Sequence, residues 1–201
     1  MTFYIGAVTF IKDQGQCGSC WAFSVTGALE GAKFKQDGSL VSFSEQQLMD
    51  CSASYGNLGC NGGFMENAMW YVIDNGITTE SKYPYKAMVG TCHEADKDWQ
   101  IRDCTVVTPL KEKSLMAAIA QQPTSVAIEA NHLSFQLYKS GVYNGNCGTK
   151  LDHGVLAVGY GTIDKKEYYK VKNSWGSKWG SNGYIYIIRN SDGKGKCGIQ
   201  M

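Results

Sequence analysis

Apolar residues recur at helical spacing in four stretches of this sequence, and residues that start or stop helices bound them. In the second stretch, Ser44 stands three residues before Gln47, as in a capping box. In the third, the apolar side chains share one face, and Asn75-Gly76 ends the pattern. The predicted helices are Trp21 to Lys35, Glu45 to Cys51, Met65 to Asp74 and Ser114 to Gln122.

Short runs rich in β-branched and aromatic residues dominate the second half of the chain. They are Ser125 to Ile128, Gly154 to Tyr160, Glu167 to Lys172 and Tyr184 to Arg189, and they predict a twisted antiparallel sheet or barrel. The sequence therefore predicts an α+β fold of two domains, a mainly helical one over residues 1–106 and a β-rich one over 107–201. A cleft between two such domains is a usual place for a substrate.

Composition excludes several classes of partner. The 201 residues are 43% apolar and 18% charged with a net charge of +1, so neither nucleic acid nor a membrane surface is an expected partner. No apolar run approaches the ~18 residues of a membrane span, and the first residues do not form a signal peptide.

Eight cysteines are the unusual feature of the composition. They indicate either a disulfide framework in an oxidising compartment or metal sites in a reducing one. Disulfides are favoured, because only one cysteine pair is spaced C-x-x-C and only three histidines are present. No metal or other cofactor is expected. An oxidising location without a signal peptide suggests release from a longer precursor, which mapping the native N-terminus would test.

The stretch Gln14 to Phe23 has the character of a nucleophile site. Cys17 and Cys20 stand three apart, and Cys20 lies where the first predicted helix begins. The partial positive charge of a helix N-terminus favours a thiolate over a thiol, and the thiolate is the reactive form. A thioredoxin-like dithiol is the other interpretation of C-x-x-C, but no strand precedes it in a βαβ pattern.

A cysteine that attacks a carbonyl also needs a base, a group that orients the base, and donors for the oxyanion. His153 enters a β run and is the candidate base. Asn173 is a candidate acceptor for its ring proton, and Trp175 would cover that hydrogen bond. Gln14 is a candidate oxyanion donor beside the backbone N–H of Cys20. Alone, His153 would more often be a structural histidine; the combination favours catalysis.

At these residues the sequence resembles the papain-like cysteine proteases, nearest the cathepsin L group. Four motifs appear in the family's order: QGQCGSCWAF, GCNGG, LDHGV and KNSWG. His153 and Asn173 follow Cys20 by 133 and 153 residues, close to the ~130 to 150 typical of this family. The resemblance implies a papain-like fold with a helical N-terminal domain, an antiparallel β-barrel-like C-terminal domain and an active-site cleft between them.

The resemblance also implies a function, a cysteine endopeptidase that hydrolyses peptide bonds through a thiolate–imidazolium pair and an acyl-enzyme. Cys20 would be the nucleophile, His153 the general base and acid, Asn173 its orienting partner and Gln14 an oxyanion donor. An apolar S2 pocket formed by Phe64, Met65, Ala127 and Gly154 would prefer Leu, Phe or Val at P2. The full set of implied substrate-binding residues is Gly18, Gly62, Gly63, Phe64, Met65, Ala127, Asp152, Gly154 and Trp175.

Further expectations follow from the same resemblance. It implies the disulfides Cys17–Cys60, Cys51–Cys92 and Cys147–Cys197, with Cys20 and Cys104 left free. Expected partners are protein or peptide substrates, the chain's own prosegment and cystatin-type inhibitors. The expected state is a monomer in a lysosome or vacuole, or secreted.

A second class of function stays open, a catalytically impaired or truncated relic of the papain fold, or a binding module. It is motivated by the ends of the chain, which are shorter than the family's usual N- and C-terminal arms. The residue that forms the floor of the S2 pocket in this family would lie beyond Met201.

Overall fold

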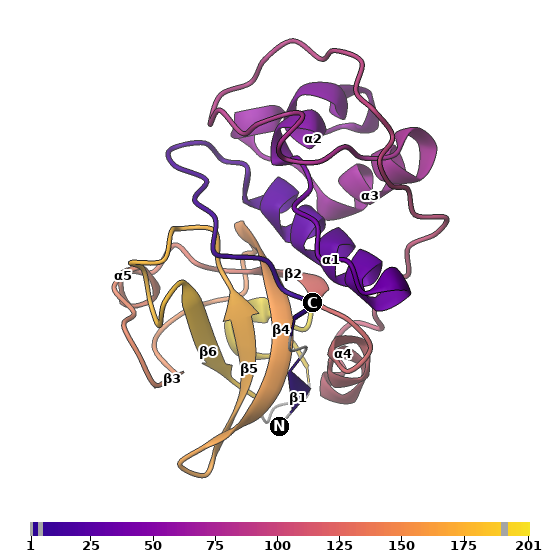
Figure 1. Cartoon of the computed structure of the whole chain (residues 1–201). Helices are drawn as coiled ribbons and strands as arrows, with labels where there is room; N and C mark the ends of the chain where they lie inside the picture. Colours follow the sequence, from indigo (N-terminus) through magenta and orange to yellow (C-terminus); the bar gives the residue numbers. More distant parts are fainter. Residues whose placement is uncertain (1, 4–5, 190–192) are drawn as a thin grey trace.

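A helical layer and a β-sheet make up the molecule, with helix α1 lying against the sheet (Figure 1). A computed structural model of the chain describes residues 2–3, 6–189 and 193–201. The helical layer contains α1 (Cys20–Asp37), α2 (Glu45–Cys51) and α3 (Met65–Asn75). All three helices were predicted; α1 begins one residue earlier and ends two residues later than expected.

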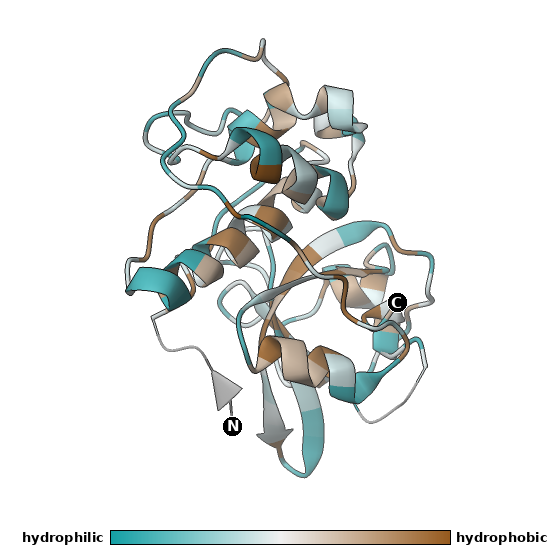
Figure 2. Ribbon diagram, turned by 90° about the vertical axis from the view of Figure 1, so that its right-hand side faces the viewer, coloured by the Kyte–Doolittle hydropathy of each residue, from teal (hydrophilic) through white to brown (hydrophobic). Residues whose placement is uncertain are grey.

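Helix α1 is central because most of its length is buried on every side. Each residue from Trp21 to Gly31 is buried, as expected for a helix that packs between two layers. Figure 2 shows apolar residues along much of α1 and hydrophilic residues at its carboxyl end. The helix ends at Gly38, whose φ of 76° and whose N–H bond to the Phe34 carbonyl form a left-handed cap.

Half of the predicted capping box is present at α2. Ser44 Oγ accepts a hydrogen bond from the Gln47 backbone N–H over 2.9 Å. The side chain of Gln47 does not return to Ser44; its Oε1 accepts from Thr78 N–H (2.8 Å) and its Nε2 donates to Tyr71 Oη (3.1 Å). Gln47 therefore ties α2 to α3 and to the segment that follows α3.

In the described part of the chain, six strands form one open sheet in the order β1-β4-β5-β6-β3, with β2 paired to β4. Their bounds are β1 Thr2–Phe3, β2 Thr124–Ile128, β3 Val142–Tyr143, β4 His153–Ile163, β5 Lys166–Lys172 and β6 Tyr184–Ile188. Every pair is antiparallel except β3 with β6, which is parallel. The expected barrel-like shape is therefore corrected: the described strands make a mixed sheet that does not close.

Two observations bear on the predicted division at residues 106 and 107. Strand β1 belongs to the sheet, because Thr2 pairs with Tyr160 of β4. Helix α4 (Glu112–Ile119) also packs on the sheet, with Leu115 and Ile119 in its core. The start of the chain thus lies in the sheet layer before the chain enters the helical layer. The division into domains at residues 106 and 107 stays a prediction.

The elements that the sequence did not predict are short. They are β1, β3, the four-residue helix α5 (Leu133–Gln136) and the 3₁₀ helices Ala53–Tyr55, Gly59–Asn61 and Lys196–Gly198. Two to four residues are too few for a hydrophobic period to be recognised.

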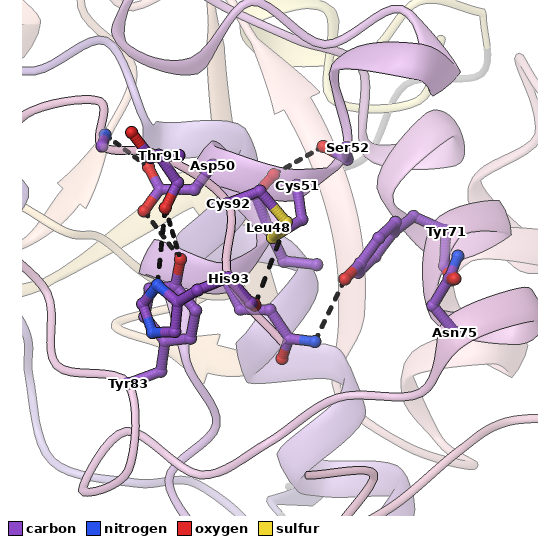
Figure 3. Close-up of a disulfide and its surroundings, with 12 residues drawn as sticks. Leu48, Asp50, Cys51, Ser52, Tyr71, Asn75, Tyr83, Thr91, Cys92 and His93 are labelled. Atoms are coloured by element: carbon purple, nitrogen blue, oxygen red, sulfur yellow. Dashed lines mark hydrogen bonds between the residues drawn. A yellow bond between two sulfur atoms is a disulfide. The ribbon is translucent and has the colours of Figure 1, made fainter. Parts of the chain in front are cut away.

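Each layer has its own hydrophobic core, and α1 joins them. Trp21 and Leu29 of α1 belong to the helical core, whereas Ala28 packs on Leu156 and Val158 of β4. The three expected disulfides, Cys17–Cys60, Cys51–Cys92 and Cys147–Cys197, are present. Figure 3 shows Cys51–Cys92, which fastens the loop after Tyr83 to the end of α2. Over the described residues, no helix combines the length and apolar character needed to cross a membrane.

Candidate active site

Cys20 is the first residue of α1, and its sulfur lies at the start of β4. The backbone N–H of Gly154 donates to Cys20 Sγ over 3.3 Å. Burial raises the pKa of the Cys20 thiol, while the backbone N–H groups of Gly154 and Trp21 act in the opposite direction. The side chain of Ser19, the residue before the helix, makes no cap to its first turn.

His153 opens β4, next to the residue that contacts the sulfur. Its Nε2 lies 2.7 Å from Asn173 Oδ1. Asn173 Oδ1 also accepts from the Ser174 N–H over 2.9 Å, which fixes the end of the amide that faces the ring. Because an amide oxygen only accepts, Nε2 carries the proton and Nδ1 is the nitrogen left for chemistry.

The imidazole of His153 is buried. His153 is 7% exposed, and the Trp175 ring lies over it with the ring centres 4.7 Å apart. Burial lowers the pKa of His153; the hydrogen bond to Asn173 and the charge of Asp152 raise it. The Trp175 ring thus lies beside the imidazole, and its cover of the His153–Asn173 hydrogen bond stays a prediction.

Gln14 is held at both ends of its side chain. Its Oε1 accepts from Ser174 Oγ over 2.7 Å, and its Nε2 donates to the Cys17 carbonyl over 2.9 Å. Its backbone N–H donates to the Ser174 carbonyl over 2.8 Å. The amide nitrogen is thereby fixed in the loop that leads to Cys20.

Two glycines allow backbones to meet at this site. A Cβ at Gly18 would lie 2.4 Å from the Cys60 carbonyl oxygen, which the Gly18 N–H contacts over 3.0 Å. A Cβ at Gly154 would lie 3.1 Å from Trp21 Cα. Glycine at these positions lets β4 and the 59–61 turn approach the start of α1.

A cleft of about 740 Å³ lies beside α1 and α3. Phe64, Met65 and Ala127, three of the four residues expected in the S2 pocket, line it. The fourth, Gly154, lines a separate internal cavity of about 20 Å³ together with Asn173 and Ser174.

The other predicted substrate-binding residues are not among those that line this cleft. Gly62 has open space where a Cβ would stand, whereas a Cβ at Gly63 would lie 2.8 Å from the Trp21 ring. Asp152 Oδ1 accepts from the Ala130 N–H over 2.7 Å, so this side chain fixes the strand ends beneath the site.

Comparison with known proteins identifies the family. The family model described as papain family cysteine protease matches residues 4–201. The chain belongs to the papain family of cysteine proteases. The papain-like fold predicted from the four motifs is thereby confirmed.

Relatives in plants and animals share about half of this chain's residues. The chain is 54% identical over 201 residues to the "Probable cysteine protease RD21B" of Arabidopsis thaliana, a match that covers 98% of this chain and 43% of that protein. It is 53% identical over 201 residues to "Cathepsin L1" of Drosophila melanogaster, with 96% of this chain and 54% of that protein covered. The chain thus spans about half the length of these curated relatives.

A solved structure supports the same assignment. The Amb a 11 cysteine protease, a major ragweed pollen allergen solved in its proform, superposes with a TM-score of 0.94 at 47% identity. The match covers 97% of this chain and 61% of that chain.

Sequence reasoning missed a buried charge cluster behind the papain-like site. Lys12 Nζ contacts Glu30 Oε1 at 2.9 Å and Glu45 Oε1 at 2.6 Å. Lys172, the neighbour of Asn173, donates to Thr9 Oγ1 over 2.9 Å, and burial lowers its pKa to about 8. The available signal was Glu30, the one charged residue in the stretch of α1 from Trp21 to Gly31.

Sequence reasoning also gave Ser174 no role, although it lies within the KNSWG motif. Its hydroxyl and its N–H bind Gln14 and Asn173, so it links the two amides of the site. Cys20 and Cys104 are the free cysteines of the described chain. Within the described residues, no three His, Cys, Asp or Glu side chains group as they would to hold a metal ion.

Proposed function

We propose that this chain is the catalytic part of a cysteine endopeptidase. The observation that carries the proposal is the juxtaposition of two contacts at the start of β4. His153 Nε2 is hydrogen-bonded to Asn173, and the next residue, Gly154, binds Cys20 Sγ through its N–H. A nucleophile, a base and an orienting amide thus come from α1, β4 and the end of β5.

The charges of the resting site support the proposal. Burial alone disfavours both a Cys20 thiolate and a His153 imidazolium. Formed together, the two opposite charges attract each other, which offsets that penalty. The N–H groups of Gly154 and Trp21 stabilise the thiolate further. We therefore propose that proton transfer from Cys20 to His153 precedes substrate binding.

The proposed reaction has two halves. The Cys20 thiolate attacks the peptide carbonyl carbon, and the oxyanion receives hydrogen bonds from Gln14 Nε2 and the Cys20 N–H. The C–N bond breaks as His153 gives its proton to the leaving amine, which leaves a thioester on Cys20. His153 then takes a proton from water, and the hydroxide attacks the thioester to release the acid and restore the thiolate–imidazolium pair.

Substrate preference follows from the cleft. Phe64, Met65 and Ala127 line it with apolar side chains, so we propose Leu, Phe or Val at P2. The open face at Gly62 leaves room for an extended substrate backbone. The proform of the ragweed relative supports synthesis with a prosegment. From the family resemblance we also propose a vacuolar, lysosomal or secreted location.

A peptidase assay with matched variants tests the function. The folded, reduced protein should cleave a fluorogenic Phe-Arg or Leu-Arg peptide at mildly acidic pH and be inactivated by an epoxide thiol trap. Cys20→Ala should abolish turnover, whereas Cys104→Ala, which removes the other free thiol, should retain it. Absence of turnover by folded protein would instead support the non-catalytic relic or binding module.

A further inference from the structure

A single phenol group joins both ends of the loop that carries Gln14 and Cys20. Tyr85 Oη donates to the Gln14 carbonyl over 2.8 Å and lies 2.6 Å from Ser19 Oγ. A phenol has one hydrogen, and the Gln14 carbonyl can only accept it. Ser19 therefore donates its hydroxyl hydrogen to the phenol oxygen.

This arrangement explains why Ser19 does not cap α1. Serine before a helix ordinarily accepts a hydrogen bond from an N–H of the first turn. Here the Ser19 side chain is 0% exposed, makes no such bond and turns to Tyr85 instead. The N–H groups at the start of α1 are consequently not occupied by the Ser19 side chain.

Tyr85 itself is rigidly supported. Its ring meets Phe23 of α1 edge-to-face with the centres 4.9 Å apart, and its N–H donates to Glu80 Oε1 over 2.8 Å. Two residues earlier, the Tyr83 hydroxyl donates to Asp50 over 3.0 Å and its ring stacks on His93, beside the Cys51–Cys92 disulfide (Figure 3).

The protonation of Tyr85 suits a donor. Burial raises the pKa of the Tyr85 phenol, and the charge of Cys20 acts in the same direction. The hydroxyl therefore keeps its hydrogen throughout the pH range in which a cysteine protease works.

We propose that Tyr85 is a positioning residue for Gln14, an inference that rests on the oxyanion role proposed above for the Gln14 amide. The two ends of Gln14 are fixed from opposite layers of the molecule. Tyr85 holds its backbone carbonyl from the helical layer, and Ser174 holds its side-chain oxygen from the sheet layer. The position of Gln14 Nε2 relative to Cys20 depends on both supports.

The test compares Tyr85→Phe with Tyr143→Phe. Tyr143 is a matched control, because its hydroxyl also donates to a backbone carbonyl, that of Asn146 (2.9 Å), and meets a serine hydroxyl, that of Ser134 (2.8 Å). Since misplacing a catalytic group by ~1 Å can cost ~100-fold, we expect Tyr85→Phe to lower kcat about 10-fold with little change in KM. Tyr143→Phe should leave kcat within about twofold of the wild type. Equal kcat values for the two variants would overturn the proposal.

A double-mutant cycle separates positioning from general destabilisation. If Tyr85 acts through Gln14, its loss should lower kcat less than about twofold when Gln14→Ala is already present. An unchanged tenfold effect in that background would overturn the proposal.

Alkylation of Cys20 by iodoacetamide gives an independent reading, because it creates no oxyanion. The rate should be the same in Tyr85→Phe and the wild type; a parallel loss would mean that Tyr85 acts on the thiolate, against the proposal. Failure of the wild type to hydrolyse peptides would contradict the proposed function itself and so is distinguishable from failure of this inference.

Discussion

Replacement of Lys12 by methionine should destabilise the protein far more than the same replacement of Lys82. Both lysines contact two carboxylates at similar distances. Lys12 Nζ lies 2.9 and 2.6 Å from Glu30 and Glu45, and Lys82 Nζ lies 2.9 and 2.5 Å from Asp96 and Asp98. The two sites differ in burial. The side chains of Lys12, Glu30 and Glu45 are 10%, 1% and 0% exposed, whereas that of Lys82 is 49% exposed.

The magnitude follows from what remains after each replacement. Lys12→Met leaves two carboxylates in the interior without their cation, and removing one partner of a buried ion pair costs about 3 to 5 kcal/mol. Lys82→Met leaves Asp96 exposed and Asp98 partly exposed to water, where an ion pair contributes about 0 to 1 kcal/mol. With about 2 to 4 °C per kcal/mol for a chain of this size, Lys12→Met should lower Tm by roughly 10 °C.

Thermal and denaturant unfolding with the disulfides intact would measure both variants. At neutral pH the Lys12→Met deficit should be at least about 2 kcal/mol larger than that of Lys82→Met. Burial raises the pKa of Glu45 and Lys12 lowers it, so without Lys12 this pKa rises further, and the deficit should shrink on acidification as the Glu45 carboxyl takes up a proton. Equal deficits, or a Lys12→Met deficit that is independent of pH, would refute the reasoning.

Two further predictions concern Glu80 and Asn173. Burial raises the pKa of Glu80 to about 7, and the charge of the nearby Glu45 raises it further. The protonated Glu80 therefore contributes stability that is fully present below the ordinary pKa of a glutamate and is lost as pH rises through about 7. Glu80→Gln should remove that loss, so the unfolding free energy of the variant should rise relative to that of the wild type between about pH 5 and 8. Plots of unfolding free energy against pH that run parallel for the two proteins would contradict this prediction. Asn173→Ala removes the 2.7 Å partner of His153 Nε2 and should lower kcat about 10- to 100-fold with little change in KM; steady-state kinetics that show an unchanged kcat would contradict the orienting role.

The fold was predictable wherever a hydrophobic period was long enough. Helix α3 and strand β5 were found within a residue of their bounds, because Gly76 stops the helix and β-branched and aromatic residues mark the strand. The pairing of Thr2–Phe3 with β4 was not predictable, because two residues carry no period and their partners lie more than 150 positions away.

The candidate site was predictable as motifs but not as a network. Cys20, His153 and Asn173 were recognisable because their residue types, order and spacing suit one chemistry. The supports of that chemistry were not, because a serine or tyrosine hydroxyl has many uses. Ser174 and Tyr85 gain their roles only when the fold brings them within 2.8 Å of Gln14.

The pH dependence of Cys20 alkylation tests the central claim most directly. Iodoacetamide should label Cys20 at a rate that persists down to about pH 5, because a His153-paired thiolate exists there, and mass spectrometry should separate this label from any on Cys104. In His153→Ala the alkylation rate should rise only in the pH range where an ordinary or buried thiol ionises, at or above about 8.5. If the alkylation rate of the wild type rises only above about pH 8.5 and follows the same pH profile as that of His153→Ala, the thiolate–imidazolium pair is contradicted.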